Sequence, residues 1–82
     1  MTISAQIAIY PLRQERLTPA VEAVGQALRD RGLQAVAGPM STYVVGEDDM
    51  VFAALREGFA GASGIGHVVM TVTVSNACPI PD

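Results

Sequence analysis

The chain has 82 residues and a net charge of −3, which describes one small, mildly acidic domain. All five basic residues are arginine and they are scattered, so the clustered basic surface of a nucleic-acid-binding protein is not expected. One cysteine and one histidine exclude an internal disulfide and a zinc site of several soft ligands, and they leave oligomerisation as the expected supplement to a small core.

The ends of the sequence and its apolar runs bear on location. The first residues lack the basic and then apolar pattern of a signal peptide, and no apolar run is long enough for a membrane span. A cytoplasmic protein without direct membrane insertion is therefore expected. A free thiol is stable in that compartment.

The first half of the chain predicts a strand and a helix. Residues 3–10, ISAQIAIY, alternate in polarity as a half-buried strand does, and proline at position 11 ends the run. Thr18 and Pro19 predict the N-cap and first residue of a helix, and Gly32 predicts its left-handed end. The apolar stripe of this helix consists of Leu17, Val21, Val24 and Leu28.

The second half predicts two strands, a helix and a final strand. Short strands are predicted at 34–37 and at 41–46 (STYVVG), on either side of a Gly-Pro break. The acidic run 47–49 begins the second helix, at the end that favours negative charge. The apolar positions of this helix are Val51, Phe52, Leu55 and Phe59, and glycines at 61, 64 and 66 end it. Residues 67–75 alternate again and predict the last strand.

The predicted order βαββαβ, with right-handed crossovers, corresponds to an α+β, ferredoxin-like fold over residues 1–82. It has a four-stranded antiparallel sheet in the order 4-1-3-2, with two helices on one face. The other face is predicted to show small, neutral side chains from Ser4 to Tyr10 and from Val69 to Ser75. Such a face suits either a second copy of the chain or a small ligand.

Four features have both a functional and an ordinary structural interpretation. Tyr10 is suited to stacking on a ligand ring or cation, and equally to an interface. His67 could act as an acid or base, or simply be a polar residue at a strand start. Cys78 could be a nucleophile, although a packed or ligand-contacting thiol fits better. The acidic run 47–49 could bind a cation or only begin a helix. Motifs of nucleophilic, phosphate-binding and redox enzymes are absent from the sequence.

Three segments together resemble a known family: ISAQIAIYPL at 3–12, GPMSTYVVGE at 38–47 and SNACP at 75–79. They are similar to the YkoF-like family of bacterial proteins that bind thiamine or hydroxymethylpyrimidine, and VFAAL at 51–55 extends the likeness. The resemblance implies ferredoxin-like domains, present as tandem repeats or as single-domain chains that assemble. It implies a non-catalytic binding protein linked to transport or salvage of these compounds. It implies a homodimer or homotetramer, and no cofactor other than the ligand itself.

The resemblance also implies a set of ligand-binding residues. Carboxamides and hydroxyls can both donate and accept, as the edge of an aminopyrimidine requires. Tyr10 could stack on the thiazolium of thiamine, and Glu47 or Asp48 could neutralise its charge. The implied ligand-binding residues are Gln6, Tyr10, Met40, Ser41, Thr42, Glu47, Ser75, Asn76 and Cys78.

The predicted topology separates these residues into two groups. Ser41 begins the third strand and Asn76 follows the fourth, so they are expected at opposite ends of the sheet, roughly 15–20 Å apart. Either there are two clusters or a second subunit brings the groups together. The main hypothesis is a small-molecule binding protein. The alternatives are a ligand-free module that oligomerises through the open face, and an enzyme that uses Cys78 or His67.

Overall fold

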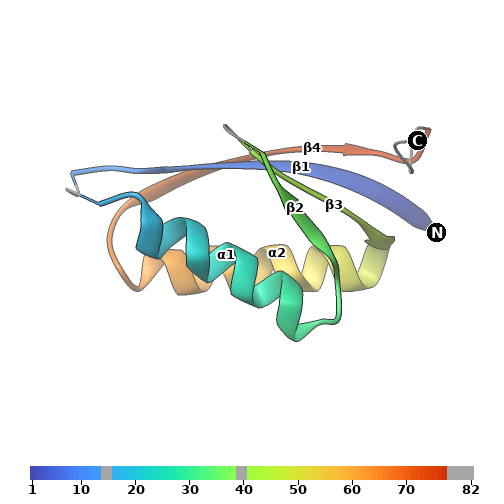
Figure 1. Ribbon diagram of the computed structural model, residues 1–82, viewed down its shortest axis with the longest axis horizontal. Helices are drawn as coiled ribbons and strands as arrows, with labels where there is room; N and C mark the ends of the chain where they lie inside the picture. The colour runs from blue at the N-terminus through green and yellow to red at the C-terminus, as the bar shows by residue number, and fades with distance from the viewer. Residues whose placement is uncertain (14–15, 39–40, 78–82) are drawn as a thin grey trace.

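The computed structural model describes residues 1–13, 16–38 and 41–77. Figure 1 shows one sheet with both helices against the same face, and the start of β1 and the end of β4 at the same end of the sheet. The sheet has the order β2-β3-β1-β4, which confirms the predicted ferredoxin-like fold. The elements are β1 (Thr2–Pro11), α1 (Thr18–Asp30), β2 (Ala35–Ala37), β3 (Thr42–Glu47), α2 (Asp48–Ser63) and β4 (Val68–Ser75).

All neighbouring strands are antiparallel, and β1 lies in the middle. Its ladder with β3 runs from the pair Thr2–Glu47 to the pair Ile7–Thr42. Its ladder with β4 extends further, as far as the pair Pro11–Val68. The last four residues of β1 therefore have β4 on one side and no strand of the described chain on the other.

The core lies between the sheet and the helices. Alternate residues of β1 point toward the helices, and Ile3, Ala5 and Ile7 are each at most 2% exposed. They pack with buried side chains of β3, α1 and α2: Val44, Val24, Leu28, Val51, Ala54 and Leu55. The predicted inward face of β1 is thereby confirmed, because a strand pattern with period two places one set of side chains on one face.

The first helix differs from its predicted start. Leu17 is the N-cap, with helical dihedral angles and no side-chain capping bond, so Thr18 is the first helical residue instead of the cap. The end is as predicted. Gly32 has φ = 73°, its N–H donates to the Arg29 carbonyl, and the Leu33 N–H donates to the Leu28 carbonyl at 3.0 Å. This pair of bonds is a Schellman motif, which requires a left-handed residue such as glycine.

The second helix is longer and less buried than its pattern suggests. It continues through Gly61 to Ser63, so the first glycine does not end it. Val51 and Leu55 are buried, whereas Phe52 and Phe59 are exposed to solvent. Of the four apolar positions named from the sequence, two therefore lie on the buried side of the helix and two on its exposed side. No helix in the described ranges has the length and hydropathy that a membrane span needs.

Candidate functional site

A pocket lies where β1 continues past the start of β3. The N-terminal half of α1 covers the helix-facing side of β1 there, and Ala37, Gly38 and Ser41 line the flank. Gly38 and Ser41 lie next to each other, because the N–H of Gly38 donates to the carbonyl of Ser41 at 2.7 Å. Beyond the pair Ile7–Thr42, the described part of the sheet consists of β1 and β4 alone, so in the described chain no strand lies between α1 and this edge of β1.

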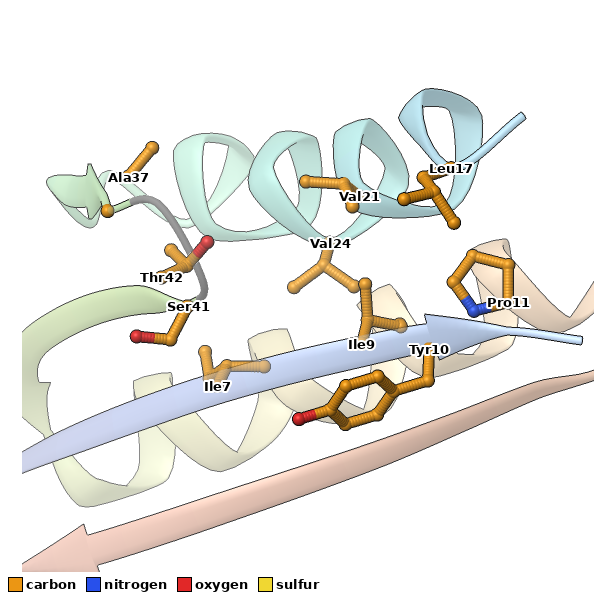
Figure 2. A pocket seen from close by; sticks show the side chains of 11 residues that line it. Ile7, Ile9, Tyr10, Pro11, Leu17, Val21, Val24, Ala37, Ser41 and Thr42 are labelled. Carbon is orange, nitrogen blue, oxygen red and sulfur yellow. The ribbon is translucent and has the colours of Figure 1, made fainter.

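We call this space the β1–α1 pocket. Its volume is about 330 Å³, at the lower end of the range for small-molecule sites. In Figure 2 the side chains of Ile7, Ile9 and Pro11 point from β1 toward α1, and those of α1 point back toward β1. The lining residues are Ile7, Ile9, Tyr10, Pro11, Leu17, Val21, Val24, Ala37, Gly38, Ser41 and Thr42.

The pocket is apolar with polar groups gathered at one end. No charged side chain is among its lining residues in the part of the chain that the structure describes. Its side-chain hydroxyls belong to Ser41 and Thr42 at the start of β3, and to Tyr10. The Gln6 side-chain amide donates to the Ser41 hydroxyl oxygen at 3.1 Å. Four of the predicted ligand-binding residues therefore lie at or beside one pocket.

Tyr10 contributes to this pocket from the opposite face of β1. Figure 2 shows its ring on the side of the strand away from Ile7 and Ile9, and the residue is 48% exposed. Its ring is therefore placed at the open face, where it could stack on a ligand that wraps around the edge of β1. It is equally placed to contact a second copy of the chain, so both sequence-based interpretations of Tyr10 remain predictions.

A second cluster lies at the other end of β3. The Thr2 hydroxyl donates to a Glu47 carboxylate oxygen at 2.7 Å, and the N-terminal ammonium pairs with Glu47 and Asp48 at 3.2 and 3.3 Å. The bond from Thr2, helped by the ammonium group, lowers the pKa of Glu47. The same carboxylates raise the pKa of the N-terminal amine, through hydrogen bonds first and charge second. The carboxylates of Glu47 and Asp48 are therefore already paired with groups of the same chain.

Ser75 and Asn76 belong to this second cluster. Ser75 pairs with Ser4 across the β1–β4 ladder, and its hydroxyl accepts the Ala77 N–H at 3.0 Å. The Asn76 amide approaches the Met1 sulfur at 3.8 Å. The first residues after β4 thus close on the start of β1, as the strand order predicts.

The two clusters cannot contact the same small molecule within one chain. Thr42 and Glu47 are five residues apart on one extended strand, which is about 17 Å. The predicted separation of the site residues into two groups is thus what the structure shows. Two of the predicted ligand-binding residues, Met40 and Cys78, lie outside the described residues.

The alternative sites receive little support from the described chain. No group of three histidine, cysteine or carboxylate side chains lies close enough to bind a metal ion within residues 1–13, 16–38 and 41–77. His67 immediately precedes β4, where its carbonyl accepts the Leu12 N–H at 2.8 Å. Its main chain therefore has a structural role in joining β1 to β4.

Sequence reasoning missed the apolar lining of the pocket and one aromatic residue. Leu17 and Val21 were assigned to a core stripe, yet they are 62% and 41% exposed because they extend beyond the buried part of the sheet.

Tyr43 pairs with Gln6 on β1, so its side chain lies on the open face beside Gln6. The open face therefore carries two tyrosines instead of the one that was predicted. The alternation of side chains along β3 is the sequence signal that could have predicted this position of Tyr43.

The comparisons with known proteins agree with this fold. A model of the YKOF-related family matches residues 2–81. The sequence has no significant match among curated proteins. Among solved structures, a Streptococcus pneumoniae protein is 23% identical with a TM-score of 0.82, over 92% of this chain and 86% of its own.

Two further solved structures share the architecture. A Thermotoga maritima protein called a "putative thiamine biosynthesis/salvage protein" is 18% identical, with a TM-score of 0.82 over 99% of this chain and 90% of its own. A domain of unknown function from Bacillus cereus is 15% identical, with a TM-score of 0.79 over 95% of this chain and 77% of its own. At these identities the likeness establishes the fold.

Proposed function

The chain belongs to the YKOF-related family, and from that premise we propose that it is a non-catalytic binding protein for hydroxymethylpyrimidine or thiamine. The β1–α1 pocket is the proposed site. The Thermotoga maritima neighbour supports a thiamine-related role, because its description names thiamine biosynthesis or salvage. A role in uptake or salvage of these compounds in the cytoplasm, with a link to a transporter, is part of this proposal.

The observation that carries the proposal is the chemistry of the pocket. A flat heterocycle buries its faces well between aliphatic side chains, and those of Ile9, Val21 and Val24 line the two walls. The polar edge of such a ring needs donors and acceptors, which the hydroxyls of Ser41 and Thr42 offer at one end. Since a buried polar edge must be fully paired, such a site would be selective.

Isothermal titration calorimetry tests this proposal. The purified protein is titrated with hydroxymethylpyrimidine and, in a parallel run, with thiamine, each at two temperatures. Binding at micromolar or lower Kd supports the proposal, and its stoichiometry shows whether subunits share a site. Absence of heat with both compounds, from protein that is folded by circular dichroism, would contradict it.

The open face supports a second candidate function, which is assembly without a ligand. Side chains on this face are uncharged along β1 and β4, including Gln6, Tyr10 and Val69, and Tyr43 adds a second aromatic. Four strands of this length present on the order of 500 Å² per copy, so two copies would bury about 1,000 Å², the lower limit for a specific interface. We propose a homo-oligomer through this face in either case.

A charge substitution on the open face tests the assembly. Thr73 lies opposite Gln6, on the edge strand β4, and is exposed. In Thr73→Glu, a carboxylate would be buried in the interface, so the oligomer should dissociate at concentrations where the wild type is assembled. Analytical ultracentrifugation measures this. Gln26→Glu, on the exposed side of α1, is the control and should leave the assembly unchanged.

A further inference from the structure

We propose that the outer edge of β4 pairs with the same edge of a second copy of the chain, so that two sheets join into one across a two-fold axis. The proposed contact runs between two antiparallel β4 strands. It lies apart from the β1–α1 pocket and from the open face, and it does not depend on a ligand. The inference therefore goes beyond the proposed function.

The two edges of the sheet differ in how well they are protected. The strand order places β2 at one edge and β4 at the other. β2 has three residues, whereas β4 has eight and pairs with β1 along its whole length. Proteins protect long edge strands with charges, prolines or bulges, because an unpaired edge is a template for another strand. β4 has the sequence VVMTVTVS, without charge or proline, and its ladder has no bulge, which is typical of a strand that pairs with a partner.

Alternate residues of β4 direct their main-chain N–H and carbonyl groups away from β1. The N–H of Leu12 donates to the carbonyl of His67, in the same register as the β1–β4 ladder, so this pair is a hydrogen-bonded one. The direction of these groups alternates along an antiparallel strand, so Thr71 also faces β1. The residues whose main chains face the outer edge are Val68, Met70, Val72 and Val74.

Residues 78–82 lie outside the described residues, and their sequence, CPIPD, is poorly suited to pair with this edge. A strand turned back through positions 76 and 77 would bring the prolines at 79 and 81 opposite Val74 and Val72. Because proline has no N–H, the outward carbonyls of both valines would receive no donor. A second β4 brings both a donor and an acceptor to each of these residues.

The pattern of β4 is complementary to itself. With the two-fold axis at Thr71, Val68 lies opposite the partner's Val74, and Met70 lies opposite the partner's Val72. Every outward-facing residue is then in a hydrogen-bonded pair, which gives about eight hydrogen bonds across the axis. Since the strand carries no charge, no like charges meet. An axis at Met70 or Val72 would leave one end of the strand outside the ladder.

Exposed aromatic side chains lie along the same edge of the molecule. α2 packs beneath β1 and β4, whereas α1 packs beneath β1 and β2. Gly58 and Gly61 of α2 face α1, since a Cβ at either position would meet a residue of that helix. Phe52 and Phe59, two turns apart, lie on the other flank of α2 and are 52% and 42% exposed. This flank is therefore on the side of β4.

The proposed axis brings these aromatic residues together. β4 runs back along α2, so Phe52 lies toward the end of β4 and Phe59 toward its start. Phe52 of one copy is then near the partner's Phe59, between two α2 helices that lie side by side beneath the joined sheet. Arg56 lies between the two phenylalanines in the sequence, and its long stem allows the guanidinium to stay in water.

The size of this contact explains why it would act together with the open face. The strand edge and the two rings offer on the order of 400 Å² per copy, so an edge-paired dimer would bury about 800 Å², less than most specific interfaces. Joined sheets also double the open face, so that two stacked pairs would bury about 2,000 Å² between them. The two interfaces support each other, and we expect a tetramer.

Disulfide cross-linking tests the inference, in chains that carry Cys78→Ser so that the introduced cysteine is the only one. Thr71→Cys should link two copies under mild oxidation, because residues of a non-hydrogen-bonded antiparallel pair have Cα atoms about 4.5 Å apart. Sheets stacked face to face are about 10 Å apart, which is too far for a disulfide. A link at this position therefore reports edge pairing and not contact through the open face.

Val69→Cys and Thr73→Cys are the matched controls. Each residue lies two positions from the axis, so its own equivalent in the partner is about 13 Å away and neither variant should link alone. Refolded together in equal amounts, the two variants should link, since Val69 lies opposite the partner's Thr73. In the Thr71→Cys chain, Phe52→Glu with Phe59→Glu should lower the yield of linked dimer at least about tenfold, because carboxylates would be buried in the contact. Ala60→Glu, at an exposed position of α2, should leave the yield unchanged.

The outcomes separate this inference from the proposed function. Links in Thr71→Cys and in the mixture, with none in the two controls alone, confirm the inference. Absence of these links, from folded protein that sediments as an oligomer, overturns it and leaves assembly through the open face standing. A wild type that sediments as a monomer at the concentrations used for cross-linking also overturns it. Calorimetry with hydroxymethylpyrimidine decides the binding function separately.

Discussion

Filling the pocket from α1 should abolish binding without unfolding the protein. Val21 lines the β1–α1 pocket and is 41% exposed, so a larger side chain can extend into the pocket without displacing the core. In Val21→Phe, the ring would occupy the space between α1 and Ile9. Because valine and phenylalanine have similar helix propensities, the helix itself should be unaffected.

The expected magnitudes follow from the size and chemistry of the site. The added phenyl group would exclude a ligand ring from a pocket of only about 330 Å³. The affinity for the ligand should therefore fall at least about tenfold, which is about 1.4 kcal/mol. If about 45 Å² of the added ring leaves water, the fold gains about 1 kcal/mol. That gain would raise the Tm by roughly 4–8 °C for a domain of this size.

Calorimetry with hydroxymethylpyrimidine and thermal melting of the free protein measure the two effects. Val74→Phe is the matched control, since Val74 is also 41% exposed but lies near the second cluster. Loss of binding in Val21→Phe, with a Tm equal to or above that of the wild type and with Val74→Phe unaffected, is the expected result. Loss of binding only in Val74→Phe would refute the reasoning and assign the ligand to the cluster around Glu47.

Three further predictions concern stability. A Cβ at Gly58 would lie 3.1 Å from the Cα of Val24, so Gly58→Val should cost about 1–3 kcal/mol in urea unfolding by forcing α1 and α2 apart. Gly32→Ala should cost about 1–2 kcal/mol, because φ = 73° is unfavourable for a residue with a Cβ, and the same unfolding curves measure it. The bond from Thr2 and the N-terminal ammonium lower the pKa of Glu47 in the folded protein. Ionised Glu47 therefore stabilises the fold above the unfolded pKa of 4.5, and this stabilisation is lost as the pH falls through the lower folded pKa. The stability difference between wild type and Glu47→Gln, from unfolding at pH 7 and at pH 3, should therefore shrink at the lower pH.

Each of these has a control or a contradicting result. Gly61→Val is the control for Gly58, since a Cβ there meets only the Cβ of Ala23, at 3.5 Å, and the change should stay within about 0.5 kcal/mol. An unchanged unfolding midpoint in Gly32→Ala would mean that the left-handed turn is not required. A stability difference for Glu47→Gln that is the same at both pH values would show that its ionised form makes no contribution.

The part of the site that the sequence predicted consists of polar residues at strand ends. Antiparallel order placed Ser41 and Thr42 toward the end of β1, although in the observed register Thr42 pairs with Ile7, four residues before that end. Glu47 and Asn76 could be placed at the opposite end for the same reason. The place of Leu17 and Val21 in the pocket lining could not be found, because both positions continue the apolar stripe of α1 that packs on the core.

Local patterns in the sequence determined the elements and therefore the fold. Alternation in β1 and β4 set which side chains face the helices, the glycine at 32 set the end of α1, and the order of elements allowed few topologies. Tertiary structure alone decided where a cavity remains. The pocket exists because α1 and β1 extend past the start of β3. How far one element extends past its neighbour depends on the register between them, and no local sequence pattern encodes that register.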